Sequence, residues 1–194
     1  MKKQLAILSV FSIIVLSGCG NNAAPPSNQP NQNQDSADQG MNHANMDHGN
    51  MDHSTSGEIP PGLKTSGNPT YKVGSQAIIK SDHMEGMNGA TATVVGAYDT
   101  TAYSISYTPT TGGPKVTNHK WIIHEEIKDA GPKPFKPGDE VVVQADHMQG
   151  MNNVRAAIDS AQPTTVYMVD YMPTTGGEMV KNHKWVTESE LSAK

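Results

Sequence analysis

Hydrophobic and polar positions alternate in short stretches beyond residue 70, a pattern typical of half-buried β-strands. Tyr103–Tyr107 has apolar side chains at its odd positions, and Tyr167–Tyr171 repeats that alternation. Short runs of β-branched and apolar residues predict further strands at 76–80, 90–98, 118–123, 140–144 and 182–187. Pro-Thr-Thr-Gly-Gly at 109–113 and 173–177 predicts turns, and 125–127 and 189–191 could each form one helical turn.

An internal duplication sets the domain organisation. Residues 71–127 align without a gap with residues 135–191, at an offset of 135 − 71 = 64, and 25 of the 57 positions are identical. The linker 128–134 is short and contains two prolines. A unit of this size is small but can fold if it closes a barrel or packs against the other repeat. We therefore expect a mainly β protein with two tandem small β-barrel-like repeats, SH3-like in kind.

The first residues predict export and a lipid anchor. Lys2 and Lys3 precede an apolar run at 5–16 that is shorter than the roughly 20 residues needed to cross a bilayer. Small residues then precede Cys19, which resembles a bacterial lipobox. Residues 1–18 are thus expected to be a lipoprotein signal peptide, with lipidation of Cys19 and anchoring on the extracytoplasmic face of the cell membrane. The alternative is ordinary secretion with a free cysteine.

Two polar segments follow the cysteine. Residues 19–40 have almost no apolar content and predict a disordered tether. Residues 41–60 are rich in Met and His, and Met-x-His recurs three times with a period of five that suits neither helix nor strand. A flexible chain with these donors could wrap a metal ion, although low-complexity drift would also explain the pattern. The donors are Met41, His43, Met46, His48, Met51 and His53.

Charge and cysteine content limit the kinds of ligand that the protein could bind. Without Lys2 and Lys3 the mature chain has 12 basic and 19 acidic residues, a formal charge of 12 − 19 = −7. That charge argues against nucleic acid as a partner and favours cations. Cys19 is the only cysteine, so no disulfide can form within the chain, and acylation would remove its thiolate as a metal ligand.

The motif Asp-His-Met-x-Gly-Met occurs at 82–87 and again at 146–151. Each copy places one imidazole and two thioethers within five residues, donors that suit Cu(I). Gly86 and Gly150 permit a sharp turn between the methionines, and Asp82 and Asp146 could orient the imidazoles. The alternative is that the methionines are flexible core filler. The candidate ligands are His83, Met84, Met87, His147, Met148 and Met151.

Asn-His-Lys-Trp also occurs twice, at 118–121 and 182–185. Trp121 and Trp185, the only tryptophans, are expected to anchor the core. Two interpretations of His119 and His183 stay open. Each histidine either bonds to the backbone at the start of a strand or adds an imidazole to the Met loop of its own repeat.

The motifs together resemble those of a known family. The lipobox, the Met/His-rich spacer and two copies of His-Met-x-Gly-Met, Pro-Thr-Thr-Gly-Gly and Asn-His-Lys-Trp resemble the YdhK family of Gram-positive lipoproteins, which includes the copper-binding surface lipoprotein CopL. Residues 71–191 carry the repeated motifs, with Met172 where the first repeat has Thr108. The resemblance implies a β-rich pair of repeats and a role in copper resistance at the envelope.

We expect a membrane-anchored protein that binds Cu(I) as cargo, limits its entry and acts beside a copper-exporting ATPase system. No motif supports an enzyme, because no Ser, His and Asp stand in a nucleophile context. The rival interpretation is a cell-envelope interaction module that binds a peptide or wall polymer, with incidental metal binding.

Overall fold

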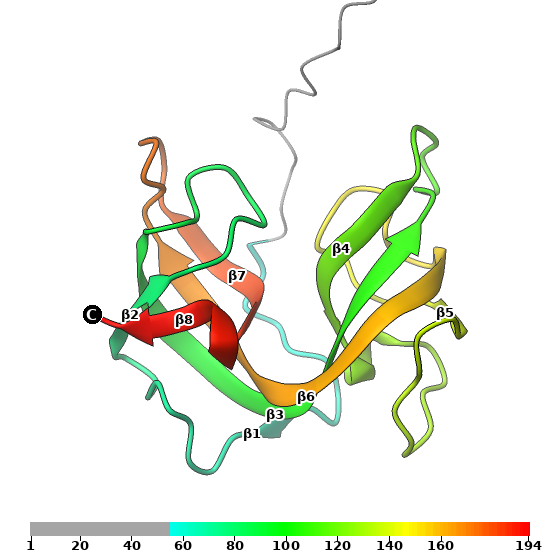
Figure 1. Ribbon diagram of the computed structural model, residues 1–194, viewed down its shortest axis with the longest axis horizontal. Coiled ribbons are helices and arrows are strands. Elements are labelled where there is room, and N and C mark those ends of the chain that lie inside the picture. Colours follow the sequence, from blue (N-terminus) through cyan, green and yellow to red (C-terminus); the bar gives the residue numbers. More distant parts are fainter. Residues whose placement is uncertain (1–54) are drawn as a thin grey trace, which may run out of the picture. The chain divides into compact units, whose positions relative to one another are not determined.

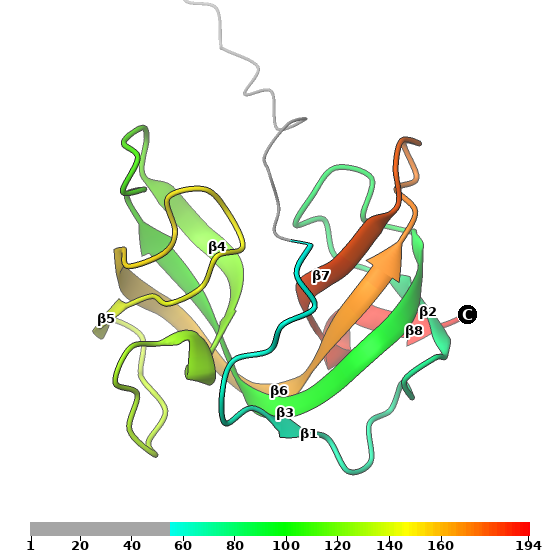
Figure 2. The same cartoon turned by 180° about the vertical axis from the view of Figure 1, so that it is seen from behind.

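The computed structural model describes residues 55–194, and its regular structure is almost entirely β (Figures 1 and 2). This confirms the mainly β class. None of the helices among residues 55–194 is long and apolar enough to cross a membrane. The elements are β1 (Lys64–Thr65), β2 (Gln76–Ile79), β3 (Thr91–Tyr107), β4 (Val116–Ile123), the 3₁₀ turn η2 (His124–Glu126), β5 (Glu140–Val142), β6 (Arg155–Tyr171), β7 (Val180–Thr187), the 3₁₀ turn η3 (Glu188–Glu190) and β8 (Leu191–Ala193).

Several predictions lie outside the described residues. They are the signal peptide, Cys19, the tether and the six Met-x-His donors Met41, His43, Met46, His48, Met51 and His53.

Two strands of 17 residues, β3 and β6, organise the fold. The sequence predicted two strands in place of β3, but no Gly or Pro separates Tyr98 from Tyr103 and the chain continues extended. The two strands pair antiparallel along their lengths, and Thr100 lies opposite Thr164, its equivalent in the second repeat. The duplicated halves are therefore related by an approximate twofold axis at this pair.

The pairing of β3 with β6 exchanges strands between the repeats. The first lobe contains β2, the start of β3, the end of β6, β7 and β8, while the second contains the end of β3, β4, β5 and the start of β6. All eight strands form one sheet that does not close into barrels, in contrast to the two barrel-like repeats expected. In Figure 1, β3 and β6 run side by side through both lobes.

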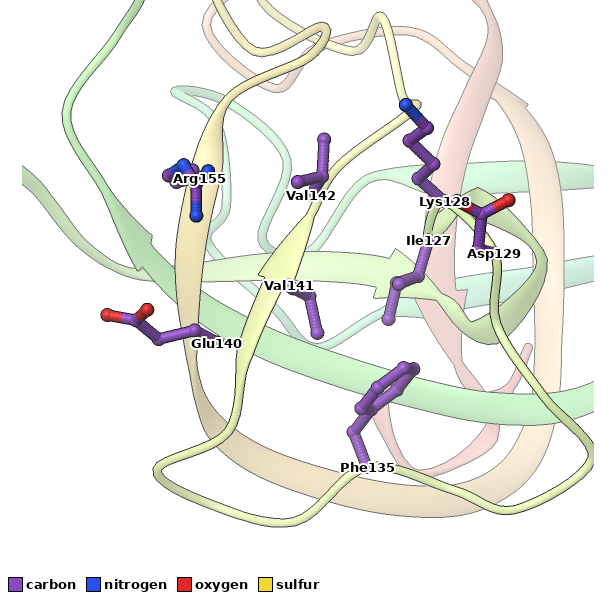
Figure 3. Close-up of a pocket in the computed structure, with 8 residues that line it drawn as sticks. All are labelled: Ile127, Lys128, Asp129, Phe135, Glu140, Val141, Val142 and Arg155. Atoms are coloured by element: carbon purple, nitrogen blue, oxygen red, sulfur yellow. The ribbon is translucent and has the colours of Figure 1, made fainter.

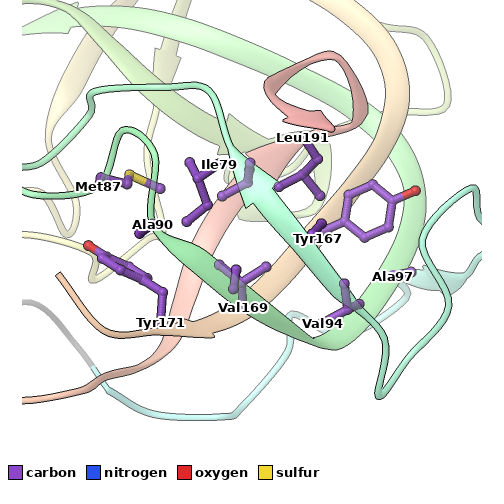
Figure 4. Close-up of a cluster of buried hydrophobic side chains, with 12 residues drawn as sticks. Ile79, Met87, Ala90, Val94, Ala97, Tyr167, Val169, Tyr171 and Leu191 are labelled. Atoms are coloured by element: carbon purple, nitrogen blue, oxygen red, sulfur yellow. The ribbon is translucent and has the colours of Figure 1, made fainter. Parts of the chain in front are cut away.

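Each lobe has its own core. Figure 4 shows the first, where Ile79 and Leu191 pack with Tyr167 and Tyr171 of β6. A third cluster joins the lobes and contains both tryptophans, Trp121 (6% exposed) and Trp185 (0%), which confirms them as core residues. Full burial of a large apolar side chain contributes about 1.5–3 kcal/mol.

Candidate metal centre

The Met loops are built on tight turns. In the first lobe the amide of Met87 donates to the carbonyl of Met84 at 3.2 Å, and Gly86 at the bend has φ +72°. The second lobe repeats this between Met151 and Met148, also at 3.2 Å. The left-handed conformation favours glycine, so the sharp turn predicted from the sequence is confirmed.

Each loop packs against the Pro-Thr-Thr-Gly-Gly turn of the other repeat. The amide of Thr174 donates to the carbonyl of Gly86 at 2.8 Å, and the amide of Thr110 donates to that of Gly150 at 3.0 Å. The approach is close, since a Cβ on Gly86 would lie 2.6 Å from the hydroxyl oxygen of Thr175. This contact was not predicted from the sequence, because each turn lies far from its loop along the chain.

A carboxylate orients the histidine of each loop. His83 Nε2 lies 2.7 Å from Glu190 Oε1, and these side chains are only 9% and 14% exposed. His147 Nε2 makes the same contact with Glu126 Oε1, also at 2.7 Å. The aspartates that precede the histidines, which were expected to have this role, are exposed: Asp82 and its equivalent Asp146 face solvent. The glutamates come instead from the 3₁₀ turns that follow β4 and β7.

The same carboxylates accept hydrogen bonds from the tryptophans. Trp121 Nε1 donates to Glu190 Oε2 at 2.8 Å, and Trp185 Nε1 donates to Glu126 Oε1 at 3.1 Å. Because Trp121 lies in the second lobe and Glu190 in the first, both bonds cross between the lobes. Each loop histidine is thus held through a carboxylate that also ties the lobes together.

Glu190 is ionised although little of its side chain is exposed to solvent. Burial opposes its ionisation, but the hydrogen bond and charge of His83, with bonds from the Thr187 amide and Trp121, lower the pKa of Glu190 to about 2. The neutral tautomer of His83 that donates its Nε2 proton to this carboxylate has its lone pair on Nδ1.

The Nδ1 atoms of His83 and His147 are buried, and no described residue bonds to them. A buried polar atom left without a partner costs roughly 1–3 kcal/mol, so such atoms are rare and need an explanation. A histidine held by a carboxylate on one nitrogen, with the other nitrogen open, is the arrangement found in metal-binding histidines.

Tyr171 brings the loop and β7 together. Its hydroxyl lies 3.6 Å from Met84 Sδ, and its ring meets that of His183 edge-on, with centroids 5.9 Å apart. Burial raises the pKa of Tyr171 to about 12, so the phenol stays neutral. Register shifts flank the pairing of His183 with Val169 on β6, and such irregularities re-aim side chains.

The second lobe has the same arrangement. The hydroxyl of Tyr107 lies 4.0 Å from Met148 Sδ, and its ring meets the ring of His119 edge-on, with centroids 6.0 Å apart. His119 and His183 therefore lie in the lobes of the Met loops of the other repeat. The hypothesis that each faces the loop of its own repeat is wrong, because strand exchange separates the two halves of a repeat.

Met87 and Met151 differ from the other loop methionines. Both are fully buried in the lobe cores, and Met87 Sδ lies 4.0 Å from the hydroxyl of Ser81. Figure 4 shows Met87 among the core side chains. Met84 and Met148 are only half-buried. The candidate donors of a lobe are thus a loop histidine, the methionine after it and the β7 or β4 histidine.

Other places in the described region offer less. No three His, Cys, Asp or Glu side chains gather within residues 55–194 in a way that could hold a metal. The pocket in Figure 3, about 370 Å³, has an apolar floor that includes Phe135 and Val141, with Lys128, Glu140 and Arg155 among the charged residues around it. It contains none of the predicted ligands.

Comparisons with known proteins agree with the duplication. The sequence matches the family described as "Protein of unknown function (DUF1541)" twice, at residues 73–124 and 137–188. It is 57% identical over 193 residues to the "Uncharacterized protein YdhK" of Bacillus subtilis strain 168, covering all of this chain and 90% of that protein.

Solved structures of YdhK from Bacillus subtilis show the same fold. A crystal structure at 66% identity has a TM-score of 0.72 and covers 74% of this chain and 97% of its own. A solution structure of the YdhK C-terminal domain, at 68% identity, has a TM-score of 0.61 and covers 63% of this chain and 93% of its own. These solved chains consist almost wholly of the matched region, so that region folds by itself in the relative.

Proposed function

This chain belongs to the DUF1541 family, and we propose that it is an extracytoplasmic lipoprotein that binds Cu(I) and sequesters it. In this proposal Cys19 carries the lipid and residues 41–53 add further Met and His donors. The protein contributes to copper resistance by limiting entry of the ion and acts beside a copper exporter.

The observation that carries the proposal is the state of the loop histidines. In both lobes Nε2 is held by a carboxylate 2.7 Å away, and Nδ1 is buried without a hydrogen bond to any described residue. A structural histidine would gain by pairing its second nitrogen. A histidine that binds a metal needs its second nitrogen without a hydrogen bond. This arrangement occurs in both copies.

The neighbouring donors favour a soft ion. Met84 and Met148 supply thioethers, which are ligands without losing a proton and which prefer Cu(I) to harder ions. The tyrosines beside them are neutral phenols and add no charge that would attract a divalent ion. His183 and His119 are the candidate third donors, contributed by the other repeat in each lobe.

The test is an anaerobic Cu(I) titration of residues 55–194 against a competing chelator, which excludes the Met-x-His segment. We expect two equivalents, reduced to one by His83→Ala with Met84→Leu and to none when His147→Ala and Met148→Leu are added.

The matched control exchanges the core pair, Met87→Leu with Met151→Leu. This change keeps volume roughly constant, costs under about 1.5 kcal/mol per site and should leave two equivalents. The proposal would be contradicted if the folded variant with all four substitutions bound Cu(I) as well as the wild type. It would also be contradicted if the wild type bound Zn(II) tightly and bound Cu(I) no better than that variant does.

A further inference from the structure

Residues 55–58 cover one face of β7 in the first lobe. Asn182 Nδ2 donates to the carbonyl of Thr55 at 2.9 Å, and Lys184 Nζ donates to the carbonyl of Glu58. Gly57 lies between these two carbonyls, and a Cβ on it would already touch Asn182 Nδ2 at 3.4 Å. The strand therefore holds a segment of the chain by two backbone carbonyls, with a glycine at the point of close approach.

In the second lobe, β4 presents the same donors in the same local structure. Asn118 and Lys120 stand at the positions equivalent to the asparagine and lysine of β7. Asn118 and Asn182 have the same left-handed φ of +51°. The amide of each asparagine bonds to a side chain of the paired long strand, Ser106 in one lobe and the equivalent Asp170 in the other.

The two faces differ in what covers them. The asparagine and lysine of β4 are exposed, whereas those of β7 are half-buried. Trp121 of β4 is 6% exposed and Trp185 of β7 is 0% exposed. Burial lowers the pKa of Lys184, while Lys120 Nζ lies over the indole of Trp121, 5.3 Å from the ring centroid. The face of β4 is thus a copy of the face of β7 without the segment that covers it.

The chain itself contains a segment that fits this face. Figure 2 shows the start of the described chain, in cyan, beside β7 and between β7 and β4, and Cα atoms of these two strands approach within 8 Å. Among the preceding residues 41–54 the one glycine is Gly49. Residues 47–50 therefore match 55–58 in having a glycine at the third position. The chain from Asn50 to Thr55 spans at most roughly 18 Å, which allows 47–50 to reach β4.

The covalent connection favours this occupant over others. A segment joined by a short linker has an effective concentration in roughly the millimolar range, which a free peptide rarely reaches. The same residues 55–58 from a second copy are a poorer candidate, because they would have to leave β7 of their own chain, where two side chains bind them.

We propose that residues 47–50 dock on Asn118 and Lys120 of β4 in the way that residues 55–58 dock on β7. The contact consists of hydrogen bonds to backbone carbonyls and needs no metal, so it does not depend on the proposed function. It fixes the middle of the Met/His-rich segment on the second lobe.

The experiment compares chain 20–194 with chain 55–194, both kept metal-free by a chelator. Lysine acetylation followed by peptide mass spectrometry measures the rate at which Lys120 reacts. We expect Lys120 to react at least about twofold more slowly in the longer chain, because docking engages its ammonium group. Lys184, which is covered in both chains, should react at one rate. In nitrogen-15 spectra the side-chain amide of Asn118 should shift between the chains while that of Asn182 does not.

Two valine substitutions in chain 20–194 test the occupant. Gly49→Val places a branched side chain where the asparagine must approach, and it should restore the Lys120 rate of chain 55–194. Gly40→Val is the matched control, because it makes the same change outside residues 47–50, and it should leave Lys120 slow.

Three results would overturn the proposal. The first is an equal Lys120 rate in the two chains, and the second is slow labelling that persists in Gly49→Val. The third is protection of Lys120 that grows with protein concentration, which would assign the face of β4 to a second copy. None of these results bears on Cu(I) binding, which is measured separately on chain 55–194.

Discussion

Removing the Glu190 side chain should destabilise the fold as well as the site. Its carboxylate accepts four hydrogen bonds: from His83 Nε2 at 2.7 Å, Trp121 Nε1 at 2.8 Å, and the amide and hydroxyl of Thr187 at 3.0 and 2.9 Å. Glu190→Ala leaves these partly buried donors without their acceptor. An unsatisfied buried group costs about 1–3 kcal/mol.

We therefore expect Glu190→Ala to lower the free energy of unfolding by about 3 kcal/mol, since several donors lose their acceptor at once, a large part of the 5–15 kcal/mol typical of a domain. Urea unfolding followed by tryptophan fluorescence and circular dichroism measures the loss. Glu188→Ala is the control, since Glu188 accepts one bond, from Tyr167 at 3.1 Å, and should cost about 1 kcal/mol. Equal losses in the two variants would refute the assigned role of Glu190.

Three further predictions follow. The pKa of Glu190 is lowered from 4.5 to about 2, so its contribution to stability is present above pH 4.5 and lost as the pH falls toward 2; urea unfolding across that range should show a smaller loss in Glu190→Gln. Gly86→Ala should destabilise more than Gly112→Ala in the same assay, because both have positive φ but only Gly86 meets a neighbour within 4 Å. Separate chains 55–127 and 135–194 should not fold as monomers, measured by circular dichroism with sedimentation, and should gain β structure when they pair; a folded monomeric repeat would contradict the strand exchange.

Local features were predictable because they depend on few residues. The alternation at Tyr103–Tyr107 requires a strand whatever it pairs with, and the residues are in β3. Gly86 marks the bend because only glycine adopts its φ without strain. Trp121 and Trp185 were expected in the core because of their size, and they are buried there.

The partners of these elements were not predictable from one sequence. With 25 of 57 positions identical, a Met loop meets the same turn and the same histidine whether it pairs within its repeat or with the other. Alternation does not distinguish the two pairings, since both bury the same faces. The role of Glu126 and Glu190 was not predictable for the same reason. Both repeats have Glu at this position, but many residues that only pack in the core are also the same in both repeats.

The strand exchange explains why the duplication preserves some positions and alters others. Each lobe takes the first half of one repeat and the second half of the other, so two copies of a single repeat could build the same pair of sites as a homodimer. In such a dimer both turns would be identical by necessity. Joining the copies through residues 128–134 removes that constraint, so the turn 172–179 can carry Met172, Glu178 and Met179 where the turn 108–115 has Thr108, Pro114 and Lys115. The candidate donors His83, Met84, His147 and Met148 show no such divergence, which is expected if both lobes bind the same ion.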